Sequence, residues 1–155
     1  DYGVFRPSEE VFEAWEKTRD VAQALKANVI VFQCPTKFTE STENIENMRY
    51  FFTSIDRQDF MFVWEARGKW SNEVITTLCQ ELDLIHCGNP LEGEMLHKGI
   101  GYWRLHGGRN YRHQYTDEEL ARLRELSGNE AYVLFNNITM HNDALRFKEL
   151  IGSKG

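Results

Sequence analysis

Charged and polar side chains gather at the carboxyl ends of several apolar, β-type segments of this sequence. Each lies among the last residues of its segment or directly after it; they are Gln33, Glu65, Arg67, His86, Arg104, His106, Asn136 and Asn137. A charge buried among apolar strands is costly unless it is paired. Glu65, Arg67 and Arg104 therefore need one another, water or a charged ligand, and we expect a polar site at these strand ends.

Two arginines, a histidine and a carboxylate in one site could bind an anion and move a proton. Arg104 and Arg109 would hold a phosphorylated or carboxylated substrate, because a guanidinium offers a planar pair of donors. His106 would act as general acid or base, and Glu65 would set its protonation state or serve as partner base. The same groups could instead form an internal Glu–Arg network that only stabilises the fold.

The remaining candidate binding residues lie in loops and at strand ends. Gly107 and Gly108 directly follow the strand that carries Arg104, and consecutive glycines let backbone N–H groups converge on an anion; an ordinary turn is the alternative. The amides could bind substrate hydroxyls or satisfy loop backbone groups. The full substrate-binding set that the sequence predicts is Gln33, Arg67, Arg104, Gly107, Arg109, Asn136, Asn137 and Asn142.

Two other chemistries use residues at the same strand ends. His86, His106 and Glu65 could hold a divalent ion, which would make the protein a metal-dependent hydrolase of phosphodiesters or nucleic-acid ends. No HxH or HExxH spacing is present, and the arginines would repel a cation, so no metal ligand is assigned. Cys34 or Cys87 could act as a nucleophile beside a histidine. A non-catalytic binding or scaffold protein is a further alternative.

Composition limits the class of protein. A chain of 155 residues, 41% hydrophobic, can bury one core, so residues 1–155 are expected to form a single domain. A net charge of -6 makes nucleic acid unlikely as the main partner. The three cysteines have no CxxC spacing and are expected to be reduced and buried.

No apolar run approaches the roughly 20 residues of a membrane span, and no leader pattern opens the chain. A cytoplasmic protein without a membrane partner is therefore expected. His97, His113 and His141 fall in predicted loops or at a helix start, where we expect them to be solvated. Because the first residue is Asp1 and not methionine, we also expect that residues upstream are missing.

Five short segments rich in β-branched and aromatic residues predict strands, each stopped by Gly, Pro or Asn. They cover residues 28–34, 59–67, 82–87, 101–106 and 131–137. Helical spacing predicts intervening helices: one after the N-cap Ser8, others over 41–55, 71–81 and 141–151, and one opened by the capping box of Thr116 and Glu119. Residues 91–98 are expected to form a loop.

Strands that alternate with helices of this length predict parallel pairing through right-handed crossovers. The fold class is therefore α/β. Alternation alone fits an open doubly wound sheet and a barrel equally well. Along each strand the side chains alternate between two faces, so Arg104 and His106 should lie opposite Trp103 and Leu105, which should face the helices.

Four ordered motifs resemble those of the YecE-like family, domain of unknown function 72 (DUF72). They are residues 25–38 with Gln33, Pro35 and Phe38; Trp64-Glu-Ala-Arg67 followed by Trp70; Tyr102-Trp-Arg-Leu-His-Gly107 followed by Tyr115, Glu119 and Leu120; and Tyr132-Val-Leu-Phe-Asn-Asn137 followed by Asn142, Ala144 and Leu145. Together they span the chain from about residue 20 onwards. The family has no established activity to carry over, so substrate, reaction and cofactor stay unknown.

The resemblance implies a TIM-like (β/α) barrel, of which this chain would be the C-terminal portion: a partial barrel of about five parallel strand–helix units. The family's opening motifs, a Gly-Cys-Ser-Gly-Trp strand and a Glu-x-Asn-x-Thr-Phe-Tyr strand, are absent. Since such a barrel closes with eight strands, missing N-terminal strands or a second chain would be needed to complete it. The third strand ends Ile85-His86-Cys87, where many relatives would have an Asp, so the role of this strand's end stays open.

Overall fold

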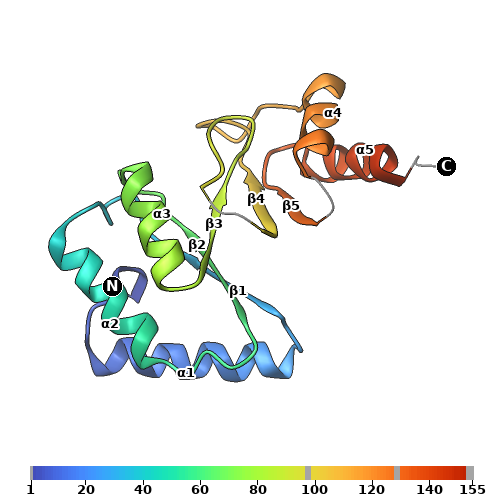
Figure 1. The fold of residues 1–155 in the computed structure, drawn as a ribbon. Helices are drawn as coiled ribbons and strands as arrows, with labels where there is room; N and C mark the ends of the chain where they lie inside the picture. The colour runs from blue at the N-terminus through green and yellow to red at the C-terminus, as the bar shows by residue number, and fades with distance from the viewer. Residues whose placement is uncertain (1, 97–98, 128–129, 153–155) are drawn as a thin grey trace. The chain divides into compact units, whose positions relative to one another are not determined.

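The computed structural model describes residues 2–96, 99–127 and 130–152 (Figure 1). The chain divides into two compact units, unit 1 (Asp1–His86) and unit 2 (Cys87–Gly155). Strands and helices alternate along it: η1 (Tyr2–Val4), α1 (Glu9–Ala24), β1 (Val29–Gln33), α2 (Thr42–Ser54), β2 (Met61–Glu65), α3 (Asn72–Glu81), β3 (Leu84–Gly88), β4 (Gly101–Leu105), α4 (Asp117–Leu126), β5 (Ala131–Phe135) and α5 (Met140–Gly152). All five predicted strands are found, and each is shorter than predicted.

Every strand pair is parallel, and the order is sequential, β1-β2-β3-β4-β5. A doubly wound sheet reverses its strand order at a switch point, whereas sequential parallel strands joined by helices are the arrangement of a (β/α) barrel. The fold class is therefore the predicted one, α/β, with five parallel strands and their helices as a partial TIM-like barrel; among the described residues, only β3 lacks a helix after it. The described helices include none with the length and apolar composition needed to cross a membrane.

Local sequence explains where the helices begin. The side chains of Ser41 and Ser71 accept hydrogen bonds from the backbone N–H groups of Asn44 and Val74, which caps α2 and α3. Ser8 takes the N-cap position of α1, but its side chain makes no cap hydrogen bond. The predicted capping box that opens α4 is complete. Residues 91–96 form no helix, as expected, and residues 97–98 lie outside the described chain.

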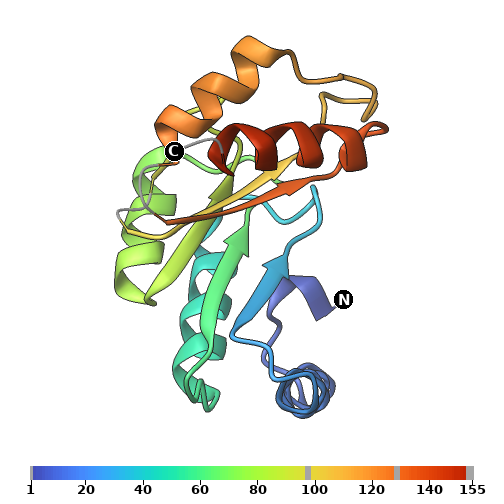
Figure 2. The ribbon, with the colours of Figure 1, turned by 90° about the vertical axis from the view of Figure 1, so that its right-hand side faces the viewer.

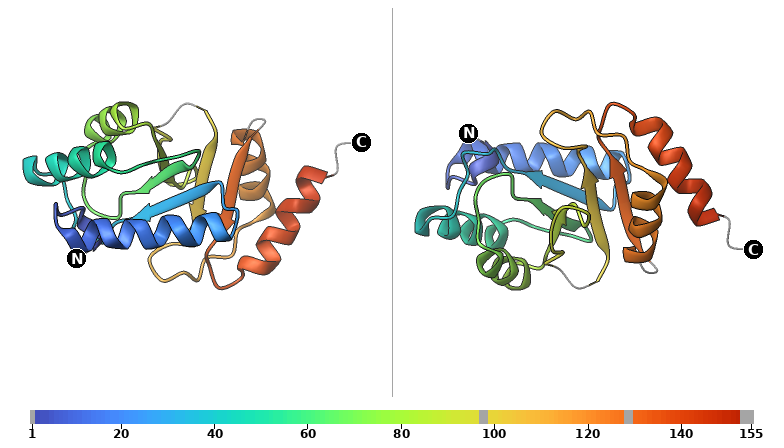
Figure 3. Two further views of the ribbon diagram at one scale, coloured as in Figure 1. Left: turned by 90° about the horizontal axis from the view of Figure 1, so that it is seen from below. Right: turned by 90° about the horizontal axis from the view of Figure 1, so that it is seen from above.

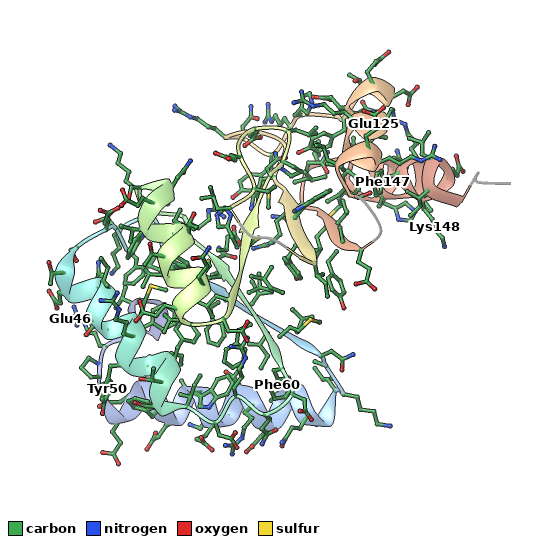
Figure 4. All side chains as sticks on the ribbon, viewed as in Figure 1. Glu46, Tyr50, Phe60, Glu125, Phe147 and Lys148 are labelled. Atoms are coloured by element: carbon green, nitrogen blue, oxygen red, sulfur yellow. The ribbon has the colours of Figure 1, made fainter. Side chains whose placement is uncertain are left out.

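Unit 1 has an aromatic core between its helices and one face of β1 and β2. The Phe32 ring of β1 lies 5.1 Å from that of Phe62 on β2 and stacks on Trp15 of α1. Phe51 of α2 closes the cluster, with its ring 5.9 Å from Phe32. Phe60, just before β2, is buried, whereas Tyr50 of α2 is exposed (Figure 4).

Unit 2 has its own core, between β4 and β5 and the two helices that cover one face of this strand pair (Figure 2). Its buried members are Trp103, Leu105, Tyr115, Leu120, Leu123 and Phe147. Phe147 points into this core from α5, while its neighbour Lys148 is exposed (Figure 4). Trp103 and Leu105 thus face the helices, so Arg104 and His106 lie on the opposite face of β4, as predicted.

Candidate functional site at the ends of β4 and β5

His106 and Asn136 are neighbours because β4 and β5 lie side by side and end in register (Figure 3). Leu105 pairs with Phe135, and the backbone N–H of Asn136 donates to the Leu105 carbonyl at 2.9 Å. The side-chain Nδ2 of Asn136 is 3.0 Å from Nδ1 of His106. An amide nitrogen only donates, so Nδ1 accepts and the ring hydrogen of the neutral imidazole lies on Nε2.

The loop after β4 is folded onto the start of α5. The Tyr111 carbonyl accepts from the Ile138 N–H at 2.7 Å, and the His113 N–H donates to the Gly107 carbonyl at 3.1 Å. The Tyr111 ring meets that of His106 edge to face, with centroids 5.7 Å apart. The loop thereby holds an aromatic wall beside His106.

Gly107 is a glycine for reasons of packing. Its φ is +71°, and a Cβ at this position would lie 2.6 Å from Cβ of Asn137. Its N–H donates to the Tyr115 hydroxyl at 3.0 Å. Burial raises the pKa of that hydroxyl, which keeps it protonated. Because this N–H is bonded within the protein, an anion at this loop would use the groups that follow it, around Gly108 and Arg109.

Asn137 and Asp143 hold the loop after β4 in place through hydrogen bonds. Asn137 is 3% exposed, and its Nδ2 donates to the His113 carbonyl at 2.7 Å and to Oδ2 of Asp143 at 2.6 Å. Asp143 is fully buried and also accepts from Thr139 at 2.8 Å and from Arg146 at 3.0 Å. These contacts are those expected of a residue that satisfies a loop. Asn142, by contrast, is exposed on α5.

The chain around His106 is locally basic although the protein is acidic. Residues 95–116 contain no Asp or Glu, and their cationic side chains are Lys98, Arg104, Arg109 and Arg112. Arg104 is half-buried on β4, and Arg109 and Arg112 are exposed on the loop. Arg112 is not among the residues predicted for the site. The long interval without a carboxylate is the sequence feature from which Arg112 could have been predicted.

Unit 1 has a different polar group at the end of β2. Glu65 is 4% exposed, and Nη1 of Arg67 lies 3.4 Å from its Oε1. The expected pairing of this carboxylate with an arginine is therefore found. Gln33 pairs in register with Glu65 across β1 and β2, and it is exposed.

The thiols do not favour nucleophilic chemistry. All three cysteines are free and buried, as predicted. Cys34 is 1% exposed, and burial raises its pKa to about 12, although a hydrogen bond from Trp64 acts in the opposite direction. A nucleophilic cysteine needs its thiolate near neutral pH, which this environment opposes.

Histidine and carboxylate positions offer no evident metal centre. The described residues include no group of three or more His, Cys, Asp or Glu side chains that could hold an ion. His113 is exposed, and its Nε2 lies 2.8 Å from a carboxylate oxygen of Glu119. His141 is exposed, and His86 is half-buried on β3. His97 lies outside the described residues.

The predicted residues thus fall into two groups. Gln33, Glu65 and Arg67 belong to unit 1. Unit 2 carries Arg104, His106, Gly107, Arg109, Asn136, Asn137 and Asn142. Within unit 2 the fold brings His106 and Asn136 together and places Asn137 beneath Gly107. That Glu65 and Arg67 share a cavity with Arg104 and His106 stays a prediction.

Comparisons with known proteins agree on one family. The family model described as "Protein of unknown function DUF72" matches residues 4–154. A DUF72 family protein of Thermotoga maritima is 19% identical with a TM-score of 0.70, over 95% of this chain and 66% of its own. One from Enterococcus faecalis is 15% identical with a TM-score of 0.72, over 100% of this chain and 70% of its own. No curated protein matches the chain.

Proposed function

We propose a function from the polar residues of unit 2 for this chain, which belongs to the DUF72 family of proteins of unknown function. It acts as an enzyme on a small anionic substrate, phosphorylated or carboxylated, at the carboxyl ends of β4 and β5. The observation that carries the proposal is the 3.0 Å contact between Asn136 and His106. It places an oriented imidazole within a cationic stretch that has no carboxylate.

In this proposal His106 is the acid–base group. Asn136 donates to Nδ1, so the neutral ring offers its Nε2–H to a substrate oxygen as a hydrogen bond. The ring transfers this proton as an acid only from its imidazolium form, which requires that Nδ1 takes a proton and the Asn136 amide turns its oxygen towards it, and Nε2 as base restores that form. Tyr111 lies against the ring edge-on and limits its rotation. A general acid held in one tautomer has a defined direction of proton transfer, which is what an oriented histidine contributes to catalysis.

Arg104 and Arg109 bind the substrate's anionic group. Guanidinium groups suit phosphate and carboxylate because they donate two parallel hydrogen bonds. Arg104 lies on the same face of β4 as His106, two residues before it, and Arg109 follows three residues after it on the loop. The substrate's charge would offset the cationic character of residues 95–116.

Glu65 remains the second candidate catalytic residue, with Gln33 and Arg67 as candidate binding residues of unit 1. Its carboxylate is almost completely buried and lies beside Arg67, an arrangement that keeps a charge in an apolar environment. Glu65→Gln separates the two roles. A catalytic carboxylate loses turnover in this variant at unchanged ligand affinity, whereas a structural one loses only stability.

The experiment is a titration of the full chain with sulfate, inorganic phosphate and phenyl phosphate, in which binding is measured by isothermal calorimetry and by amide chemical shifts. Arg104→Gln and Arg109→Gln should each weaken phosphate binding roughly tenfold, because each removes a charge-assisted contact. Arg122→Gln, on the exposed face of α4, removes the same charge elsewhere and should change nothing. Equal affinity in all four proteins would remove the anion site from unit 2.

Partners and location complete the proposal. We infer a cytoplasmic protein, since its three cysteines are free thiols, and one whose main partner is not nucleic acid, since its net charge is -6. A barrel of this class closes with eight strands. We therefore also infer that further strands, from upstream chain or from a second chain, complete the sheet.

A further inference from the structure

The turn after β4 presents backbone N–H groups that have no acceptor among the described residues. It covers residues 108–111, and the Tyr111 N–H closes it by donating to the Gly108 carbonyl at 3.3 Å. The N–H groups of Gly108, Arg109 and Asn110 donate to no group of the described chain. This turn can therefore bind a hydrogen-bond acceptor from outside the protein.

The backbone conformation of the turn brings these N–H groups toward one side. The φ angle is +74° at Gly108 and +60° at Tyr111, and the two residues between them have no positive φ. A change in the sign of φ between consecutive residues turns their N–H groups toward a common point, which forms a nest for an anion. A Cβ at Gly108 would meet nothing within 4 Å, so no other described part of the chain covers this side of the turn.

Two guanidinium groups accompany the nest. Arg109 lies within the turn and Arg112 directly follows it, and both are exposed. Neither side chain makes an ion pair or a hydrogen bond with a described residue. Arg146 of α5, by contrast, pairs with both Asp117 and Asp143. The charges of Arg109 and Arg112 are therefore open to an anion from solution.

The donors of this turn fit a phosphate monoester better than they fit other anions. A carboxylate has two oxygens and one charge, and a single guanidinium can satisfy it with two parallel hydrogen bonds. A phosphodiester also has two terminal oxygens and one charge. A phosphate monoester has three terminal oxygens and a charge of about −1.5 to −2 at pH 7. Three N–H groups and two cations match that number of oxygens and that charge.

We infer that the substrate of the proposed function is a phosphate monoester, whose terminal phosphate is bound by the turn after β4. Its oxygens accept from the three N–H groups of that turn, and Arg109 and Arg112 balance its charge. The inference rests on the proposed function, because it takes His106, two residues before the turn, as the group that meets the ester oxygen. Arg112 thereby determines specificity, since it favours a phosphate over a carboxylate.

The test compares three anions that share a phenyl ring: phenyl phosphate, its methyl diester and benzoate. Isothermal calorimetry on the full chain should give a Kd for phenyl phosphate at least about tenfold lower than for either of the others. The ratio of monoester to diester affinity should rise between about pH 5 and pH 7, because only the monoester loses a second proton there. Equal affinities for all three would overturn this inference and leave the proposed function standing, whereas binding of none would overturn both.

Amide chemical shifts locate the bound phosphate. Phenyl phosphate should move the backbone amide resonances of Gly108, Arg109 and Asn110 further than those of unit 1, and further than benzoate does. Binding of phenyl phosphate that leaves these three amides unmoved would place the anion elsewhere and overturn the inference, while an anionic substrate would still be possible.

Substitutions of Arg112 test its role in specificity. Arg112→Gln should weaken binding of phenyl phosphate roughly tenfold and binding of benzoate less than about twofold, and Arg112→Lys should restore part of the loss. Arg122→Gln, exposed on α4, is the matched control and should bind all three anions as the parent does. Circular dichroism checks that each variant is folded. Equal losses for phenyl phosphate and benzoate in Arg112→Gln would show only a general attraction of anions and overturn the role in specificity.

Discussion

The polar residues at the end of β2 in unit 1 and those at the ends of β4 and β5 in unit 2 both follow apolar strands, but the two groups differ in how their charges are arranged. At β2 the carboxylate of Glu65 is buried and has an arginine two residues further on. At β4 and β5 a histidine and an amide meet beside a loop with exposed arginines. The first group pairs a carboxylate with a cation, whereas the second lies in a stretch of sequence, residues 95–116, that contains arginines and no carboxylate.

This difference separates a structural from a ligand-binding use of similar residues. A compensated buried pair stabilises its surroundings only while both partners are present. Exposed arginines such as Arg109 and Arg112 cost little stability, because water solvates them, and an anion in solution can reach them. Substitutions at β2 should therefore change mainly the free energy of unfolding, whereas charge substitutions around His106 should change mainly ligand affinity.

The largest effect is expected where the loop beside His106 packs on Asn137. Gly107→Ala should lower the free energy of unfolding by roughly 2–4 kcal/mol, because the new Cβ meets Asn137 and because φ is positive. Gly108→Ala is the matched control: its φ is +74°, but the space around it is open, so about 1–2 kcal/mol is expected. Urea unfolding measures both. Equal losses would mean that the close contact does not fix the loop.

A smaller effect tests the compensated side of the comparison. Glu65→Gln keeps the size of the side chain but removes the charge that Arg67 balances, and should lower the free energy of unfolding by about 1–2 kcal/mol. His106→Gln should cost less, under about 1 kcal/mol, because its amide side chain can still accept from Asn136. The comparison fails if His106→Gln proves the more destabilising of the two in the same urea titration.

Much of the fold follows from local sequence. The five strands are segments of β-branched and aromatic residues with stops after them, and their alternation with helices, interrupted only at the loop over residues 91–98, predicts parallel pairing. Periodicity alone does not distinguish a barrel from a doubly wound sheet, since strand order is a long-range property; the resemblance to a family made that choice. Ser8 shows the limit of cap signals, because its side chain occupies the right position without making the bond.

The candidate site was predictable only in part, for the same reason. Side-chain alternation correctly placed His106 opposite Leu105, and the strand ends suggested Asn136 as a neighbour. Asp143 escaped prediction because a carboxylate in the first turn of a helix ordinarily faces solvent and the helix dipole. It is buried only because the segment before Tyr115 folds onto α5. Such long-range contacts leave no local pattern.

The smallest effect concerns the exclusion of water from Cys34, which follows β1 and lies beside the pair of Glu65 and Arg67. Burial raises the pKa of Cys34 to about 12, against about 8.5–9 in the unfolded chain. The unfolded thiol loses its proton above pH 9 while the folded one keeps it, so the stabilisation is complete below about pH 8 and declines as the pH rises toward 12.

Between pH 8 and pH 9.5 this decline should amount to roughly 0.8 kcal/mol for one thiol. Urea unfolding across this range measures it, and Cys34→Ala should reduce the slope of stability against pH whatever its effect on stability itself. Cys79, whose pKa burial also raises to about 12, gives a matched variant away from Glu65, Cys79→Ala. If only Cys79→Ala reduced the dependence of stability on pH, Cys34 would be accessible to water. The neighbouring carboxylate of Glu65 would then not lie in an interior from which water is excluded.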